Sequence, residues 1–264
     1  MEEIPKLGLG TWQNENPEEC SNAVKTALNM GYEHIDTAQI YENEEYVGKG
    51  LEQADVDRDD YYLASKVWIK KLNPDQVISS TEESLEKLGV DKVDLMYVHW
   101  PSGEYNPKET LNAMQELVQK DMADSIGISN FTPEQVDEAM EIAGEDIVAN
   151  QVEMHPLLQQ EKLLEKCREH NIKLVAYSPL ARGEVFSVPE LEEIAEKHEV
   201  SEAQVSLAWF MQKDGVVAIP KATSEEHIKD NYQALDLELD SEDIEKIESI
   251  DKEERMVDPG FSPW

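Results

Sequence analysis

The chain has 264 residues, 40% of them hydrophobic, and its 58 acidic residues against 23 basic ones give a formal net charge of −35. This length suits one large domain, and the apolar content is enough for a sizeable core, which excludes an intrinsically disordered chain. No run of eighteen apolar residues occurs, and no basic face is available to neutralise phosphates. Neither a membrane nor nucleic acid is therefore an expected partner.

The acidic residues are spread over nearly every helix-like segment. Repulsion among them destabilises a compact chain in dilute buffer and is screened by salt, so we expect adaptation to high intracellular salt, as in halophilic microbes. A merely acidic enzyme is the alternative. Residues 1–6 lack the basic patch and apolar stretch of a secretory signal, which predicts a cytoplasmic protein. Cys20 and Cys167 have no metal-ligand spacing, so we expect buried free thiols and no metal site.

Short apolar, β-rich runs alternate with amphipathic helical patterns along the chain. The predicted strands are residues 7–9, 34–35, 62–64, 95–98, 125–128, 149–152, 174–176 and 216–219. Between them, apolar residues recur at helical spacing in segments such as 17–30, 74–88, 107–119, 133–143 and 160–170. Asn73-Pro74, Asn106-Pro107 and Thr132-Pro133 each place a capping side chain before a proline at the first helical position.

The alternation of eight strands with helices predicts a parallel sheet closed into a single (β/α)₈ barrel over residues 1–264. An open doubly wound sheet is the alternative, but Gly8-Leu9-Gly10 lacks the third glycine of a phosphate loop and opens no helix. Residues 239–254 are predicted to form one last acidic helix. The C-terminal tail, residues 251–264, comprises the last four residues of this predicted helix and the Pro- and aromatic-rich residues 255–264.

Polar or aromatic residues follow every predicted strand. In a barrel of this kind, functional groups gather at the carboxyl ends of the strands. In chain order the strand ends are Gly10-Thr11-Trp12, Asp36-Thr37-Ala38, Ser65-Lys66, His99-Trp100-Pro101, Ser129-Asn130, Gln151, Tyr177-Ser178 and Pro220-Lys221.

Three of these strand-end residues, Asp36, Lys66 and His99, form a candidate acid–base set with Tyr41, which follows Asp36 by five residues in the loop. A tyrosine pKa near 10 is too high for an efficient proton donor at neutral pH, and a nearby cation such as Lys66 would lower it. Asp36 would keep Lys66 charged, and His99 would orient a carbonyl oxygen or share in the proton transfer. The hydride must come from a cofactor, because no side chain carries one. Taken singly, each residue also has a structural interpretation, with Lys66 as an ion-pair partner of Asp36.

Eight short motifs occur in order between Ile4 and about Asp236. They are Pro5-Lys6-Leu7-Gly8-Leu9-Gly10-Thr11-Trp12, Ile35-Asp36-Thr37-Ala38 with Tyr41, Ser65-Lys66-Val67-Trp68, Val98-His99-Trp100-Pro101, Gly127-Ile128-Ser129-Asn130-Phe131, Asn150-Gln151-Val152-Glu153-Met154-His155-Pro156, Tyr177-Ser178-Pro179-Leu180 and Ile219-Pro220-Lys221-Ala222-Thr223. Through them the chain resembles the aldo-keto reductase superfamily, in particular its short prokaryotic type related to 2,5-diketo-D-gluconate reductases.

The resemblance implies reduction of an aldehyde, ketone or keto-sugar, with Tyr41 as the general acid of a tetrad. It further implies a nicotinamide cofactor bound extended, a substrate pocket walled by Trp12, Trp68, His99 and Trp100, and a monomer. The implied cofactor contacts are Ser129, Asn130 and Gln151 at the carboxamide, Tyr177 on the ring, Ser178 and Leu180 along the pyrophosphate, and Lys221, Thr223, His227 and Asn231 at the adenosine end, with Gly10, Thr11, Trp12 and Ile219 completing the set.

The adenosine end departs from the family pattern. Relatives that prefer NADPH usually carry an arginine six residues after the lysine of this motif, where this chain has His227, and many have serine in place of Ala222. A neutral imidazole offers at most one donor and no fork. We therefore expect NADP(H) to be preferred, held by Lys221, with NAD(H) also possible. Two alternative functions are a non-catalytic nicotinamide-binding regulator and an aldolase or isomerase using Lys66 as a Schiff base.

Overall fold

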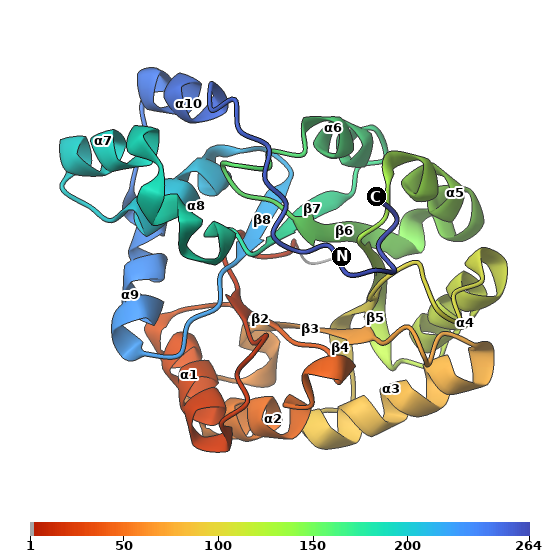
Figure 1. The fold of residues 1–264 in the computed structure, drawn as a ribbon. Helices are drawn as coiled ribbons and strands as arrows, with labels where there is room; N and C mark the ends of the chain where they lie inside the picture. Colours follow the sequence, from red (N-terminus) through yellow and green to blue (C-terminus); the bar gives the residue numbers. More distant parts are fainter. Residues whose placement is uncertain (1–2) are drawn as a thin grey trace.

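The computed structural model describes residues 3–264, and its centre is a barrel of parallel strands enclosed by helices (Figure 1). Each strand pairs with its neighbours in chain order. The strands are β1 (Leu9–Gly10), β2 (His34–Asp36), β3 (Tyr62–Val67), β4 (Val93–Val98), β5 (Ala123–Ser129), β6 (Ile147–Glu153), β7 (Lys173–Tyr177) and β8 (Val216–Ile219).

Backbone hydrogen bonds between the first and last strands close the barrel. The N–H of Gly8 donates to the carbonyl of Ala218 at 2.9 Å, and that of Gly10 donates to the carbonyl of Pro220 at 3.0 Å. A Cβ on Gly10 would lie 2.8 Å from the Ile219 carbonyl oxygen, so only glycine allows this approach. The predicted (β/α)₈ barrel is thereby confirmed. The first strand lies slightly later than residues 7–9, because Leu7 makes only an isolated bridge to Ala218.

The helices form the outer layer. They are α1 (Pro17–Met30), α2 (Glu44–Gln53), α3 (Pro74–Leu88), α4 (Pro107–Gln119), α5 (Pro133–Ala143), α6 (Glu161–Glu169), α7 (Pro189–His198), α8 (Glu202–Gln212), α9 (Glu225–Gln233) and α10 (Ser241–Glu248), with short 3₁₀ turns that include η1 (Gln39–Tyr41) and η4 (Ala181–Ser187). The predicted caps are confirmed, because the side chains of Asn73, Asn106 and Thr132 each accept from a backbone N–H of the following turn.

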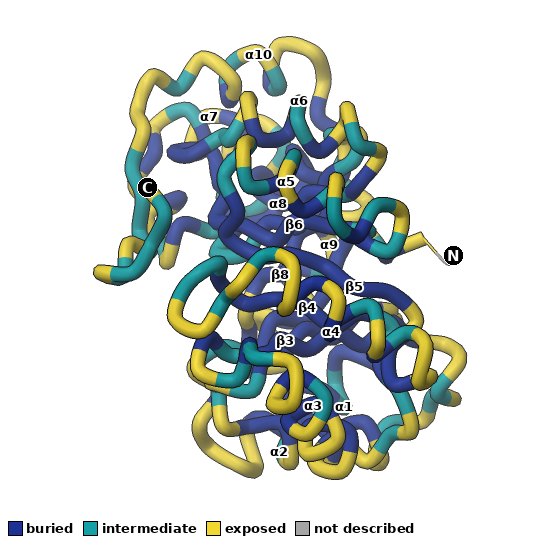
Figure 2. The backbone as a smooth tube through the Cα atoms, turned by 90° about the vertical axis from the view of Figure 1, so that its right-hand side faces the viewer, coloured by how far each residue is buried: buried dark blue, intermediate teal, exposed yellow. Residues whose placement is uncertain are grey.

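Both faces of the strands are buried, as Figure 2 shows by the dark tube at the centre of the molecule. A parallel sheet covered on both faces is built from nearly continuous apolar runs. One apolar cluster, which includes Tyr62, Tyr97 and Val175, joins residues of β3 to β8, and a larger cluster includes residues of the surrounding helices. Cys20 and Cys167 are buried free thiols, as expected. Within residues 3–264, no helix combines the length and apolar character needed to cross a bilayer.

The prediction of one helix over residues 239–254 is wrong at both ends. α10 spans only Ser241–Glu248, and the chain then runs across the end of the barrel in an irregular path, drawn in dark blue in Figure 1. The physical reason is that backbone N–H groups here donate to the barrel instead of to a preceding helical turn. The N–H of Glu254 donates to the carbonyl of Leu157 at 2.7 Å, and the next bonds reach β6.

Candidate active site

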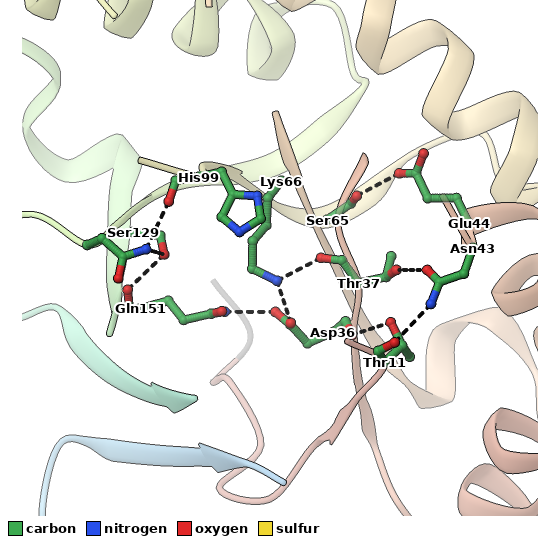
Figure 3. A network of polar contacts seen from close by, with 11 residues as sticks. Thr11, Asp36, Thr37, Asn43, Glu44, Ser65, Lys66, His99, Ser129 and Gln151 are labelled. Carbon is green, nitrogen blue, oxygen red and sulfur yellow. Dashed lines mark hydrogen bonds and ion pairs between the residues drawn. The ribbon is translucent and has the colours of Figure 1, made fainter. Parts of the chain in front are cut away.

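The four residues of the predicted acid–base set come together at one end of the barrel, and Figure 3 shows three of them, Asp36, Lys66 and His99. Asp36 ends β2, Lys66 lies near the end of β3, His99 follows β4, and Tyr41 ends the short turn η1. Lys66 is fully buried, and its Nζ donates to Asp36 Oδ1 at 2.5 Å and to the carbonyl of Thr37 at 2.7 Å. The barrel interior thus holds a lysine whose charge is met by a carboxylate and a carbonyl.

Tyr41 lies between Lys66 and His99. The Lys66 ammonium is 5.2 Å from the centre of the tyrosine ring, and the His99 ring meets that ring edge-on at 5.8 Å between centroids. Burial, the charge of Asp36 and the neighbouring Tyr177 raise the pKa of the Tyr41 phenol well above its ordinary value. The pKa of Tyr41 is therefore raised in this arrangement and not lowered as expected, because burial and the charge of Asp36 outweigh the effect of Lys66.

Burial also shifts the pKa values of Lys66 and His99. It lowers the pKa of Lys66, and Asp36 offsets part of that change. Burial, followed by the charge of Lys66, lowers the pKa of His99 well below its ordinary value, so the imidazole is neutral near pH 7. In the described chain, Nδ1 of His99 is buried without a hydrogen-bond partner. A neutral imidazole suits the orienting role better than the proton-transfer role.

Asn43, which the sequence analysis missed, ties the tyrosine turn to the strand ends. Its amide donates to the carbonyl of Thr11 at 2.9 Å, and its Oδ1 accepts from the Thr37 hydroxyl at 3.0 Å. On the other side of Tyr41, Gln39 Oε1 accepts from the N–H of Trp68 at 3.1 Å. Side-chain amides two residues before and after Tyr41, half-buried in Gln39 and buried in Asn43, thus fix its turn against the ends of three barrel strands. The only sequence signal was a pair of polar residues flanking the tyrosine.

A cavity of about 280 Å³ opens directly on these groups, whereas Lys66 lies behind its wall. A larger hollow of about 1060 Å³ beside α2 and α3 contains none of the predicted site residues. Of those predictions, the cavity wall includes Gly10, Thr11, Trp12, Asp36, Tyr41, Trp68, His99, Trp100, Ser129, Asn130, Gln151, Tyr177, Ser178, Ile219 and Lys221. Leu180, Thr223, His227 and Asn231 do not line it, and Ile40, Arg182, Val257 and Pro259 line it without having been predicted.

Hydrogen bonds preorganise the inner wall of the cavity. The Ser129 hydroxyl donates to the carbonyl of Gln151 at 2.8 Å, and the Gln151 amide donates to Asp36 Oδ2 at 2.8 Å. Asn130 adopts φ = 64°, a left-handed conformation that asparagine tolerates. Its amide donates to the carbonyl of His99 at 3.1 Å, and its Oδ1 accepts from the Tyr177 hydroxyl at 2.8 Å. Fixed amides beside an aromatic ring fit a nicotinamide carboxamide and ring.

The outer end of the site is more exposed. Lys221 follows β8 and is exposed, as is His227, which directly follows Glu226 in the first turn of α9. The loop after β7 carries Ser178 at φ = 49° and Arg182 at φ = 54°, both left-handed. The Arg182 guanidinium lies 4.6 Å from the centre of the Trp12 ring, and both residues line the cavity.

Known proteins match nearly the whole chain. The pattern of the aldo/keto reductase family matches residues 6–252. Glyoxal reductase of Bacillus subtilis (strain 168) is 41% identical over 254 residues, covering 96% of this chain and 91% of that protein. Methylglyoxal reductase DkgB of Escherichia coli O157:H7 is 40% identical over 264 residues, covering 98% of each.

Solved structures agree with the sequence relatives. A crystal structure provisionally described as 2,5-diketo-D-gluconic acid reductase B has a TM-score of 0.94 at 36% identity, with 98% of this chain and 92% of that chain covered. An aldo-keto reductase from a Medee basin deep-sea metagenome library has a TM-score of 0.93 at 34% identity, with 97% and 95% covered. Because the family pattern, the relatives and the tetrad at the strand ends coincide, the chain belongs to the aldo/keto reductase family.

Proposed function

We propose that the protein reduces small carbonyl compounds to alcohols with a nicotinamide cofactor, and that Tyr41 donates the proton. The observation that carries this proposal is the position of Tyr41 in the cavity wall, beside neutral His99 and in front of the buried Lys66–Asp36 pair. Relatives named glyoxal and methylglyoxal reductases support a small aldehyde or dicarbonyl as the substrate class.

The residues of the chain divide the work of the reaction. His99 donates a hydrogen bond to the carbonyl oxygen and directs it toward the Tyr41 hydroxyl. A reduced nicotinamide, when bound, would supply the hydride that the carbonyl carbon needs. The Tyr41 phenol passes its proton to the oxygen, which gives the alcohol, and the remaining phenolate regains a proton from water. Lys66 stabilises that phenolate electrostatically, and Asp36 keeps Lys66 in place.

The proposed cofactor is NADP(H), with only a modest preference over NAD(H). Ser129, Asn130 and Gln151 would hold the carboxamide, and Tyr177 would lie beside the ring. Lys221 attracts the 2′-phosphate, whereas the exposed His227 supplies no forked donor.

The Schiff-base alternative meets an obstacle in the position of Lys66. Its Nζ is enclosed by Asp36 and Thr37, and the residue does not line the cavity in the described chain. A non-catalytic regulator would not need the complete set of four acid–base residues. Neither alternative is favoured by a specific contact.

The proposal is tested by following oxidation of NADPH with methylglyoxal, glyoxal and a panel of other carbonyls in molar salt. We expect turnover with at least one dicarbonyl. No oxidation with any carbonyl would contradict the reductase, and trapping of a substrate on Lys66 by borohydride would favour the Schiff-base enzyme.

A further inference from the structure

A buried carboxylate on the barrel holds the irregular C-terminal segment, residues 254–264. Glu153 is the last residue of β6 and is fully buried. Its Oε1 accepts from the N–H of Met256 at 2.6 Å, and its Oε2 accepts from the N–H of Val257 at 2.9 Å. These bonds join residues more than a hundred positions apart in the sequence.

Further contacts keep this carboxylate ionised and directed toward the segment. The ring of His155 lies with Nε2 2.9 Å from Oε1, and Arg255 Nη1 is 4.0 Å from Oε2. Burial alone would raise the pKa of Glu153, but the hydrogen bonds from His155, Met256 and Val257 outweigh it and lower the pKa. A charged acceptor of backbone N–H groups binds about twice as strongly as a neutral one.

Beyond this anchor, the segment covers the cavity. Val257 and Pro259 line the cavity wall. The Phe261 ring meets Trp100 edge-on at 5.4 Å and Trp68 at 6.0 Å, and both tryptophans belong to the same wall. At the chain end, Trp264 packs on Trp100 at 5.5 Å and under the Arg255 guanidinium at 4.0 Å.

From these contacts we propose that Glu153 is a positioning residue, which fixes the C-terminal segment over the cavity and so makes the enzyme select small carbonyls over bulky ones. The selectivity part rests on the proposed reductase function. Glu153 itself does not line the cavity in the described chain. It acts through the segment, because the bonds at Met256 and Val257 set where the following cavity-lining residues lie.

The test uses Glu153→Gln, a truncation that removes residues 256–264, and the two changes combined. The glutamine side chain has the same shape as glutamate. Its NH₂ group would replace one carboxylate oxygen and face a backbone N–H that needs an acceptor, so one of the two bonds to the segment is lost. Asp94→Asn is the matched control, because Asp94 also accepts from a backbone N–H, that of Leu63 at 2.7 Å, near the start of β4 and away from this cavity.

The first readout is the ratio of kcat/KM for methylglyoxal to that for 2-naphthaldehyde. We expect Glu153→Gln to lower this ratio about tenfold, because one hydrogen bond to a charged group changes an equilibrium constant about tenfold. The change should appear in KM, and kcat for methylglyoxal should change less than about twofold. The truncation should give a similar change, and Glu153→Gln should add nothing in the truncated protein. An additive effect in the truncated protein would overturn the proposal, because Glu153 would then act independently of the segment.

The second readout needs no activity. Trypsin cleavage after Arg255, followed by mass spectrometry, should release residues 256–264 about ten times faster from Glu153→Gln than from the wild type or Asp94→Asn. Faster release without any carbonyl turnover would uphold the anchor and overturn the reductase. Unchanged release and an unchanged ratio in an active enzyme would overturn the anchor and leave the reductase intact.

Discussion

The two ends of the proposed cofactor site are built in opposite ways. At the tetrad end, Lys66, Asp36 and Gln151 are buried and hydrogen-bonded to one another before any ligand arrives. At the adenosine end, Lys221 and His227 are exposed on separate elements. Groups that stabilise a developing charge are most effective when they are fixed in advance in a dry site. Under the proposed function, the chemistry is built into the buried barrel interior, whereas the choice of cofactor depends on a few surface side chains.

The largest effect is expected from Lys66→Met at the buried end. It leaves the Asp36 carboxylate unpaired inside the barrel, which costs about 3–5 kcal/mol of unfolding free energy. Urea unfolding measures this loss. The double variant Asp36→Asn/Lys66→Met removes the stranded charge and should recover part of it. A Lys66→Met protein as stable as the wild type would mean that the pair is not coupled in this way.

Salt affects exposed charges far more than buried ones, because it screens mainly the charges that water reaches. With a net charge of −35, the fold should gain about 2 kcal/mol, or about 4–8 °C in Tm, between low salt and about 2 M KCl. Thermal unfolding in chloride salts checks this. A Tm that is flat or falls with KCl would contradict both the repulsion and the proposed adaptation to salt.

At the adenosine end, His227→Arg should raise the preference for NADPH over NADH about tenfold, or about 1.4 kcal/mol, by adding a forked donor. The measurement is the ratio of kcat/KM for the two cofactors. Glu226→Gln changes the local charge equally without supplying a fork, so it should shift the ratio less. A wild-type preference above roughly a thousandfold, about 4 kcal/mol, would show that His227 does not weaken the site.

The smallest change is expected in the pH profile. The raised pKa of Tyr41 keeps the phenol protonated, and the lowered pKa of His99 keeps the imidazole neutral. Both groups are therefore in their working forms between about pH 6 and 9, and kcat/KM should vary less than about threefold there. Loss of activity begins only when His99 gains a proton on the acid side or Tyr41 loses one on the alkaline side. An alkaline decline centred near pH 8 would contradict this assignment.

The sequence predicts the barrel and the residues at its strand ends well, because both follow from local patterns. Strand–helix alternation and Asn-Pro or Thr-Pro caps indicate the elements, and a parallel barrel brings its strand ends to one face. The pKa of Tyr41 could not be predicted in the same way. This pKa depends on burial and on the nearby charge of Asp36, which no spacing along the chain reveals.

The C-terminal segment shows a second limit. Its acidic composition and apolar spacing favour a helix through residue 254, whereas its path is set by Glu153 and Leu157, about a hundred residues away. The clue was an acidic residue at the buried end of a strand. The partners of that residue could not be identified before the fold was known.

The central claim, that Tyr41 is the proton donor, is tested most directly by Tyr41→Phe in a single turnover with bound NADPH and excess methylglyoxal. The rate of cofactor oxidation should fall about 10²–10⁴-fold, the usual contribution of a general acid. The dissociation constant for NADPH, read from protein fluorescence, should stay within about twofold because the inner wall remains intact. A single-turnover rate within about threefold of the wild type would contradict the account.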